Sequence, residues 1–497
     1  MATYKTPGVY VNEPDAFPNS IVEVPTDIPA FVGYTQIARQ GTADLTGKPT
    51  RVTSLQDFEA LFGSAPATRF RFTLKGGQPS RAAAHPFFLY DSLRLFWANG
   101  GGPCWIVSVG PCATGQTPTV TSPDPFGEEI WTALGKQPEP SMVVIPDAVA
   151  MPDADAYKAI WDKAFPHCIA MKNRVAIIDV FEGSQPRSLD DADVISGTKG
   201  LRNQLAYDDM SFGAAYYPWL NTNLYQAADA TFEKIHNEDL GALADYVKTE
   251  FAGGADPKTA TWVDGLLTNM QNAGSDAGLA AQTHTALLSV STHYKAAIET
   301  LLAAMNLKPP SGAMAGVFAR TDTSMGVQKA PANVALNTVL SPTVSISSEE
   351  QEDLNVPLDG KAVNAIRAFA GRGTLVWGAR TLAGNSEDYR YINLRRTAIM
   401  LEQSISAALG AFTFASNDSS TWAEVSGMIS GFLTNQWKAG VLAGSRPSHA
   451  YSVSAGLGST MTAQDVTGGI LRVSVSVALS HPAEFTILEF ETQIQSA

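Results

Sequence analysis

The stretch ILRVSVSVALSHPAEFTILEFETQI, residues 470–494, shows most directly how this chain folds. From Arg472 to Leu479 apolar and polar residues alternate, which at two residues per repeat places an apolar row on one face of a strand and a polar row on the other. After the His481–Pro482 break, apolar residues occupy both faces of a second expected strand. These residues are Phe485, Ile487, Leu488 and Phe490. Such a strand needs neighbours on its edges, from this chain or from another copy.

The N-terminal region has a different character. Prolines at positions 7, 14, 18, 25 and 29 prevent a helix, because each fixes φ and removes a backbone donor, so we expect an extended arm. Within it, Gly8, Val9, Tyr10 and Val11 have strand character and stand apart from the first expected core strand, residues 30–34. An isolated strand on an arm suits addition to the edge of another sheet. A loosely attached terminus is the alternative.

Composition places the chain among globular proteins and excludes several functions. Its 497 residues allow about three domains, and 45% hydrophobic with 16% charged residues is ordinary for a globular protein. A formal charge of −14 without clustered Lys and Arg argues against nucleic-acid binding. No apolar run approaches the roughly 18 residues of a membrane span, and the N-terminus lacks a signal-peptide core. We therefore expect folding in a cytoplasm and no direct membrane insertion.

The residue types that bind metals and cofactors are sparse. Cys104, Cys112 and Cys168 contain no Cys-x-x-Cys pair, and their odd number argues against a disulfide framework, so we expect reduced, buried side chains. The seven histidines show no spacing typical of metal ligands. We expect neither a metal nor a cofactor.

An α/β layer is predicted in the middle of the chain. Short apolar stretches that read as strands alternate with expected helices at 157–170 and 194–205. The strands are MVVIPDA (142–148), RVAIIDV (174–180) and FGAAYYPWL (212–220). Strands separated by helical segments of this length are typical of parallel βαβ units.

The remaining elements follow from periodicity and capping residues. Helices are expected at 54–62 with Ser54 as N-cap, at 85–98, from about 239 to 305, and at 362–369, 394–409 and 421–438. Further strands are expected at 104–109, 374–377 and 450–454, and residues 111–140 read as a long loop. Thr462 and Asp465 have the spacing of a capping box, which predicts a short helix.

Enzyme motifs are absent from the sequence. There is no phosphate loop, no nucleophile elbow, and no Gly-x-Gly-x-x-Gly after the first βαβ strand. Asp147 and Asp179 lie at the ends of predicted parallel strands, where open α/β sheets bind ligands. They leave an α/β enzyme, hydrolase-like, as the alternative function, although such aspartates more often cap helices. We expect no catalytic residues.

Three further stretches carry a resemblance. They are PPSGAMAGVFARTDTSMGVQKAPAN (309–333), NAIRAFAGRGTLVWGARTL (364–382) and YINLRRTAIMLEQSI (391–405). Together with PGVYVNE and FVGYT near the N-terminus, they resemble contractile tail sheath proteins. This family is shared by contractile-tailed phages, R-type tailocins and phage-tail-like extracellular injection systems.

The resemblance implies an α/β (α+β) fold with four parts. We expect an N-terminal linker arm over 1–30 and the first part of an outer α/β region over 31–110. An inserted α/β outer domain with a helical insertion is expected over 111–345. A sheath polymerisation domain, completed by the N- and C-terminal arms, is expected over 346–497.

The resemblance also implies a function that is structural. Such a subunit polymerises helically around an inner tube and contracts, without nucleotide hydrolysis, to drive the tube through a target membrane. Its partners are further copies or sheath paralogues, the inner tube protein, and the baseplate and terminal cap proteins. It is assembled in a bacterial cytoplasm as part of a phage tail or of a released extracellular particle.

Site residues follow from the same resemblance. Strands from Gly8, Val9, Tyr10 and Val11, and from Phe485, Ile487, Leu488 and Phe490, are expected to complete the sheets of adjacent subunits. Thr462, Gln464 and Asp465 lie where similar sheaths have a helix that faces the tube. A plain connector between strands is the alternative for that helix.

Overall fold

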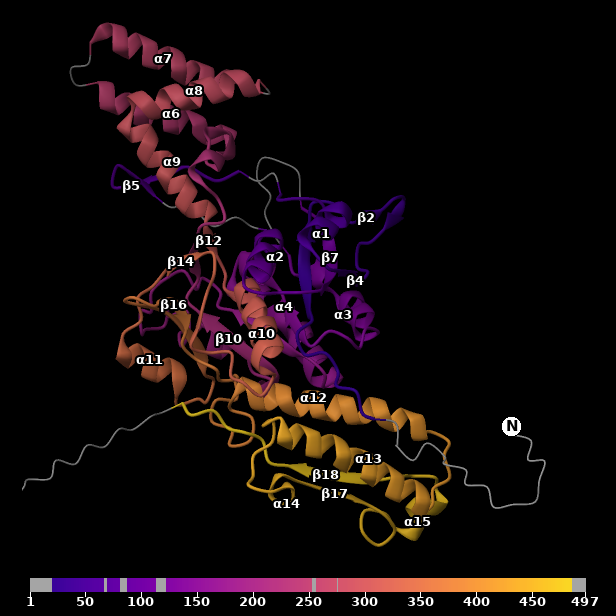
Figure 1. Ribbon diagram of the computed structural model, residues 1–497. Helices are drawn as coiled ribbons and strands as arrows, with labels where there is room; N and C mark the ends of the chain where they lie inside the picture. The colour runs from indigo at the N-terminus through magenta and orange to yellow at the C-terminus, as the bar shows by residue number, and fades with distance from the viewer. Residues whose placement is uncertain are drawn as a thin grey trace, which may run out of the picture. The chain divides into compact units, whose positions relative to one another are not determined.

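The computed structural model describes residues 20–66, 69–80, 87–112, 122–252, 256–274 and 276–484. The chain divides into two compact units. The larger unit covers residues 25–396, and the smaller unit is formed by residues 1–24 and 397–497. Figure 1 labels the helices and strands of both units.

The larger unit is built on a nine-stranded sheet whose six central strands are parallel. In spatial order these are β7 (Cys104–Pro111), β1 (Pro29–Thr35), β8 (Met142–Val144), β9 (Val175–Asp179), β10 (Gly213–Tyr217) and β15 (Val363–Phe369). Antiparallel strands complete the edges: β4 (Thr50–Val52) beside β7, then β16 (Gly373–Val376) and β13 (Val334–Ala335) beyond β15. Strands β8, β9 and β10 are buried throughout, as their unbroken apolar runs require. The predicted parallel α/β layer is confirmed.

Helices cover both faces of this sheet. Phe165 of α4 (Ala154–Met171) packs against Gly213, whereas the ring of Phe318 in α10 (Ser311–Met325) lies 6.4 Å from the ring of Tyr216. Successive strand residues point to opposite faces, so residues 213 and 216 lie on different faces of β10. Helices α4 and α10 therefore cover opposite sides of the sheet. Helix α3 (Glu128–Gly135) packs beside α4, and α2 (Leu89–Ala98) packs beside α10.

The approach of α10 to α2 is unusually close. A Cβ atom added to Gly312 would lie 2.4 Å from the carbonyl oxygen of Ser92, and one added to Gly316 would lie 2.4 Å from the carbonyl oxygen of Phe96. Because neither backbone can yield, both positions require glycine. This close packing explains why glycine occurs at two positions of the stretch 309–333, which carries part of the resemblance.

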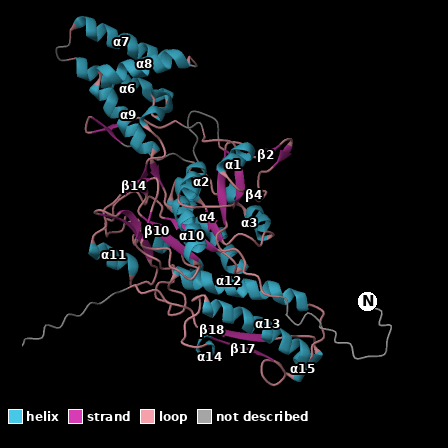
Figure 2. Cartoon of the chain, in the orientation of Figure 1, coloured by secondary structure: helices cyan, strands magenta, loops and turns pink. Residues whose placement is uncertain are grey.

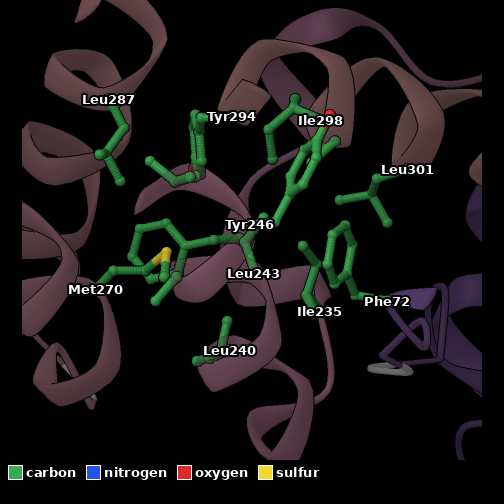
Figure 3. Packing of buried hydrophobic residues seen from close by; sticks show 14 of the residues in the cluster. Phe72, Ile235, Leu240, Leu243, Tyr246, Met270, Leu287, Tyr294, Ile298 and Leu301 are labelled. Atoms are coloured by element: carbon green, nitrogen blue, oxygen red, sulfur yellow. The ribbon is translucent and has the colours of Figure 1, made fainter. Parts of the chain in front are cut away.

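Helices were predicted over residues 239–305, and the structure has four there; this segment is called the insertion below, after the expectation that it is one. They are α6 (Leu240–Phe251), α7 (Pro257–Asn272), α8 (Ala277–Val290) and α9 (Thr292–Met305). Their apolar faces meet in one buried cluster that includes Leu243, Tyr246 and Leu301 (Figure 3). Phe70 and Phe72 complete this cluster, although they lie far away in the sequence. Phe70 and Phe72 are therefore part of the insertion's core.

Polar contacts tie the insertion to the sheet. Its stem belongs to a small sheet of β12 (Leu307–Lys308), β11 (Leu220–Thr222) and β14 (Val339–Pro342). The buried Lys308 ammonium lies 2.5 Å from Oδ2 of Asp91 in α2, and the hydroxyl of Tyr225 donates to Oδ1 of the same carboxylate at 2.8 Å. Asp91 thus holds residues from both ends of the insertion.

Short elements complete the unit. Helix α1 (Leu55–Phe62) is capped by Ser54 as predicted. Two hairpins lie at the surface, β2 (Arg39–Gln40) with β3 (Ala43–Asp44), and β5 (Thr73–Lys75) with β6 (Gln78–Ser80). The three cysteines are buried and free, as expected.

The structure corrects three local expectations. Residues 363–369 form strand β15 and not a helix, because β10 and β16 supply backbone partners on both sides. The helix expected at 194–205 shrinks to α5 (Leu201–Gln204), since the carboxylate of Asp193 accepts backbone N–H groups of the preceding turns. The loop expected at 111–140 contains α3. Helices α10 and α11 (Ser348–Asn355) were not assigned from the pattern.

Replacing Gly316 with alanine should lower the free energy of unfolding of the larger unit by about 1–3 kcal/mol, because the added methyl forces α10 away from α2. Denaturant unfolding would measure the change. Gly427 in the smaller unit's helix α13 (Ser419–Lys438) is a matched control, since nothing lies within 4 Å of its added Cβ. Gly427→Ala should stabilise by about 0.5–1 kcal/mol. Equal effects of the two substitutions would contradict the close-packing argument.

Candidate functional site

The smaller unit consists of helices and a two-stranded ribbon. Its helices are α13, the part of α12 (Ile392–Leu409) from Thr397 onward, α14 (Pro447–Ala450) and α15 (Ala463–Thr467), and its strands are β17 (Tyr451–Ala455) and β18 (Val473–Val477). Asp418 caps α13 by accepting the N–H groups of Ser420 and Thr421 at 3.0 and 3.1 Å, as expected for a turn before Trp422. The ribbon packs on α13, where the hydroxyls of Tyr451 and Thr434 lie 2.6 Å apart (Figure 2).

The two faces of the ribbon differ in burial. The half-buried face carries Tyr451, Val453, Ala455, Val473, Val475 and Val477. The other face carries four exposed serines, Ser452, Ser454, Ser474 and Ser476. The prediction of a half-buried strand over residues 473–477 is confirmed.

Both outer edges of the ribbon present backbone groups. The N–H of Ala478 donates to the carbonyl of Ala450 at 2.8 Å, which marks a hydrogen-bonded pair. Hydrogen-bonded and non-hydrogen-bonded pairs alternate along an antiparallel ladder. The serine pairs therefore bond within the ribbon, and the N–H and C=O groups of Val473, Val475 and Val477 point outward from β18. Among the described residues, no hydrogen bond engages the outward N–H and C=O groups of these three valines.

The opposite edge has the same property. By the alternation of the ladder, the backbone groups of Val453 and Ala455 point outward from β17. Each edge can therefore accept one further strand. The ribbon is a candidate site for strand addition.

The N-terminal arm leaves from this unit. The N–H of Val24 donates to Oγ of Ser404 at 3.0 Å, and Nε2 of Gln436 donates to Oε1 of Glu23 at 2.5 Å. These bonds fix residues 23 and 24 on α12 and α13. The arm residues singled out by the sequence lie outside the described residues and stay predictions. They are Gly8, Val9, Tyr10, Val11, Phe485, Ile487, Leu488 and Phe490.

The short helix α15 has the predicted cap. The N–H of Thr462 donates to the carboxylate of Asp465 at 3.0 Å, and the N–H of Asp465 donates to the hydroxyl of Thr462 at 3.2 Å. The N–H and the hydroxyl of Thr462 both donate to the Asp465 carboxylate, and together with Arg472 at 3.0 Å they lower the pKa of Asp465 to about 2. Thr462 and Gln464 are exposed. A role for this helix in facing a tube stays a prediction.

Asp147, one of the two aspartates at strand ends, serves a structural purpose. Its fully buried carboxylate accepts the N–H groups of Tyr34, Phe88 and Leu89 at 2.7, 2.6 and 3.1 Å. It thereby joins the end of β1 to the first turn of α2. Its Oδ2 atom would lie 2.5 Å from a Cβ at Gly33, which explains the glycine in FVGYT.

Asp179 does the same for α10. Its carboxylate accepts both the backbone N–H of Ser311, at 2.7 Å, and the Ser311 hydroxyl. Burial raises the pKa of each of the two aspartates to about 7, and the hydrogen bonds they accept oppose this shift in part. Both carboxylates thus accept hydrogen bonds at helix N-termini.

A third buried carboxylate was missed by the sequence reasoning. Asp322, near the end of α10, pairs with Arg396 at 2.5 Å, and both side chains are 3–4% exposed. The hydroxyl of Thr26 donates to Asp322 at 2.6 Å, and Arg396 donates to the carbonyl of Thr26 at 2.8 Å. Thr26 and Arg396 lie close to the two points where the chain passes between units. The Asp322–Arg396 ion pair, with Thr26 hydrogen-bonded to both partners, therefore fixes residues next to both connections within the larger unit.

The described residues give no sign of other kinds of site. None of their helices has the length and hydropathy to cross a membrane. Within the same ranges, no group of three His, Cys, Asp or Glu side chains is placed to hold a metal ion.

Chains in several solved structures resemble this chain over its whole length. A chain of an extracellular contractile injection system, the PVC sheath complex in contracted state, is 24% identical with a TM-score of 0.61, covering 100% of this chain and 99% of that one. A chain of the anti-feeding prophage helical sheath in contracted state gives 24% and 0.61, with 99% and 100% covered. A chain of the anti-feeding prophage baseplate in contracted state gives 23% and 0.66, with 99% and 100% covered.

This protein therefore has the fold of contractile sheath chains, and the resemblance carried by residues 309–405 is confirmed at the level of fold. No protein-family model and no curated protein matches the chain.

The buried carboxylates make stability depend on pH. Because burial raises the pKa of Asp179 to about 7, the folded state holds a proton that the unfolded state releases near its ordinary pKa of 3.8. The stability contributed by this group should be full below about pH 4 and should be lost as the pH rises to about 7. The free energy of unfolding of the Asp179→Asn variant should lack this component in urea titrations at pH 4, 5.5 and 7.5. Asp155→Asn, at an exposed carboxylate, should retain it.

Proposed function

We propose that this protein is the sheath subunit of a contractile injection machine, which polymerises helically around an inner tube. Contraction of the polymer drives the tube through a target membrane. The observation that carries the proposal is the match of the whole chain, end to end, to chains of two contracted sheaths.

The ribbon of the smaller unit supports polymerisation. A strand from one copy adds to the outer edge of β17 or β18 in the next, and its backbone groups pair with the outward groups of Val453 or Val475. Contacts of this head-to-tail kind do not close on themselves and generate open helical assemblies. The N-terminal arm and the C-terminal segment are the strands donated.

Contraction needs no nucleotide in this proposal. The extended polymer is metastable and relaxes to an arrangement with larger contact between copies, and the difference in free energy does the work. Consistent with this, the aspartates that a hydrolase would use, Asp147 and Asp179, are buried under helix N-termini.

Partners follow from the same role. They are further copies or sheath paralogues, an inner tube protein, and baseplate and terminal cap proteins. One of the similar chains belongs to a baseplate structure, which supports the baseplate contact. Assembly takes place in a bacterial cytoplasm, and the product is a phage tail or a phage-tail-like extracellular particle.

Blocking one ribbon edge should prevent assembly without unfolding the chain. In Val475→Pro the lost N–H is one that points away from β17, so the ladder within the ribbon survives while an incoming strand loses a donor. Negative-stain electron microscopy should show no tubes. Val475→Ala, which shortens the side chain but keeps the N–H, is the control and should assemble. Tubes of normal length from Val475→Pro would exclude β18 as a joint.

Deleting residues 1–19 should leave a folded monomer that cannot form sheaths, because the arm that joins copies is gone. Circular dichroism and light scattering would test folding and assembly separately. If truncated protein still gave tubes of normal length, the arm would have no role in the joint.

A further inference from the structure

Three exposed apolar side chains lie on two segments of the larger unit that ion pairs hold together. Val356 and Leu358 follow the end of α11, with relative accessibilities of 54% and 105%. Leu189, in the loop after β9, is 68% exposed. Leu189, Val356 and Leu358 are here called the Leu358 patch.

The ion pairs fix both segments. Arg187, whose side chain is only 1% exposed, pairs with Asp193 at 2.8 Å and with Asp353 of α11 at 2.9 Å. Asp353 also pairs with Arg202 at 3.0 Å. The Arg202 guanidinium donates to the carbonyl of Lys361 at 3.0 Å, which holds the far end of the segment after α11. The Leu358 patch is therefore supported from beneath at several points.

The backbone at Leu189 is strained. Its φ angle is 57°, in the left-handed region that leucine rarely adopts. Its N–H donates to Oδ2 of Asp193 at 3.1 Å, and the same carboxylate is paired with Arg187. A strained residue that keeps an apolar side chain in solvent indicates a surface that contacts another molecule.

The surroundings of the Leu358 patch are acidic. The exposed carboxylates there are those of Asp190, Asp191, Glu349, Glu352 and Asp359. The basic side chains there, Arg187, Arg202 and Lys361, are engaged within the chain itself. A partner that fits this surface presents an apolar side chain with a basic neighbour.

The hairpin of β5 and β6 has this character. Residues 60–90 contain four Lys and Arg residues and no Asp or Glu. Arg71 is paired with Asp239, whereas Lys75 and its neighbour Leu74, which is 44% exposed, lie in solvent. Gly76 and Gly77, both with positive φ, form the two-residue turn between Lys75 and Gln78. A Cβ added to either glycine would have nothing within 4 Å, so the tip projects from the surface.

We propose that the tip of the β5–β6 hairpin of one copy docks on the Leu358 patch of a second copy. Leu74 packs on the apolar side chains of the patch, and Lys75 lies beside the surrounding carboxylates. The proposal rests on the proposed function and adds a contact between larger units to the joints of the ribbon.

The arrangement of the larger unit makes this a contact between copies. The hairpin packs beside α9 at the foot of the insertion, whereas α11 packs on β15, and β5 and α11 lie well apart in Figure 1. A hairpin therefore does not reach the patch of its own chain. Because the two surfaces differ, the contact is head-to-tail and extends a polymer without closing it.

Charge reversal tests the pairing of the two surfaces. Lys75→Glu should raise the protein concentration needed for tube formation at least tenfold, because it places a carboxylate against carboxylates. Glu352→Lys should have the same effect, since Lys75 then meets an ammonium. A chain with both substitutions should assemble close to the wild-type concentration, because each changed charge meets its opposite in the next copy. Light scattering against protein concentration measures all three.

Lys295→Glu is the matched control, because this side chain is 64% exposed on α9 and lies outside both surfaces. It should assemble at the wild-type concentration, and circular dichroism should show that every variant is folded. Assembly of Lys75→Glu at the wild-type concentration would overturn the proposal. A double variant that assembles no better than the single variants would also overturn it.

Cysteine cross-linking between full-length chains tests the contact directly. A Leu74→Cys chain is mixed with a Leu358→Cys chain, allowed to form tubes and oxidised. The native Cys104, Cys112 and Cys168 are buried, and burial raises the pKa of their thiols, so they stay unreactive. Non-reducing gels should show at least tenfold more disulfide-linked dimer than with Leu288→Cys, an exposed leucine of α8, in place of Leu358→Cys.

The remaining outcomes separate this contact from the sheath role. Normal tubes without linkage between Leu74→Cys and Leu358→Cys would exclude the contact and leave the proposed function intact. Equal linkage to Leu288→Cys would show that the hairpin does not select the patch. Failure of the wild-type chain to form tubes would contradict the proposed function, and the contact proposed here would fall with it.

Discussion

The contact between α10 and α2 is the constraint on which the larger unit depends. With Gly312 and Gly316 against the backbone of α2, α10 cannot shift without a steric clash. Asp179 holds its first residue and Asp322 its last turn, the latter through Arg396 and Thr26. One helix thus connects the carboxyl end of β9 with the places where the chain enters and leaves the larger unit. Breaking a buried ion pair of this kind costs about 3–5 kcal/mol, so the anchor is firm.

The smaller unit has the opposite property. In its ribbon the inner edge of each strand is hydrogen-bonded, and the outer edge has unpaired backbone groups. In an isolated protein such open edges favour uncontrolled pairing with strands of other chains. Serines on its exposed face and a formal charge of −14 reduce that hazard. Each added strand brings several backbone hydrogen bonds of about 0.5–1.5 kcal/mol net. In the proposed polymer, modest joints of this kind would be repeated in every copy.

A protein with a doubly covered parallel sheet would ordinarily be searched for a ligand at the carboxyl ends of its strands. In this protein, helix N-termini pack against the ends of two of these strands. Asp147 and Asp179 receive backbone N–H groups from α2 and α10 in place of a ligand. At these two positions the N–H groups of a helix N-terminus donate to carboxylates of the chain itself.

Periodicity and capping residues alone determined much of this structure. The alternation over 473–477, the apolar runs of β8 to β10, the helical character of residues 239–305, and the caps at Ser54, Asp418 and Thr462 depend on neighbours in sequence, and each was predicted. Other positions could not be interpreted from the sequence, because their contact partners lie tens to hundreds of residues away. They are the glycines at 312 and 316 and the aspartates at 147, 179 and 322. Strand β15 was misread for a related reason, because its partners β10 and β16 decide its conformation. The sequence by itself thus determined most helices, strands and caps. Only the tertiary structure decided which buried groups meet and which backbone edges stay open, because both depend on distances between segments that no local pattern contains.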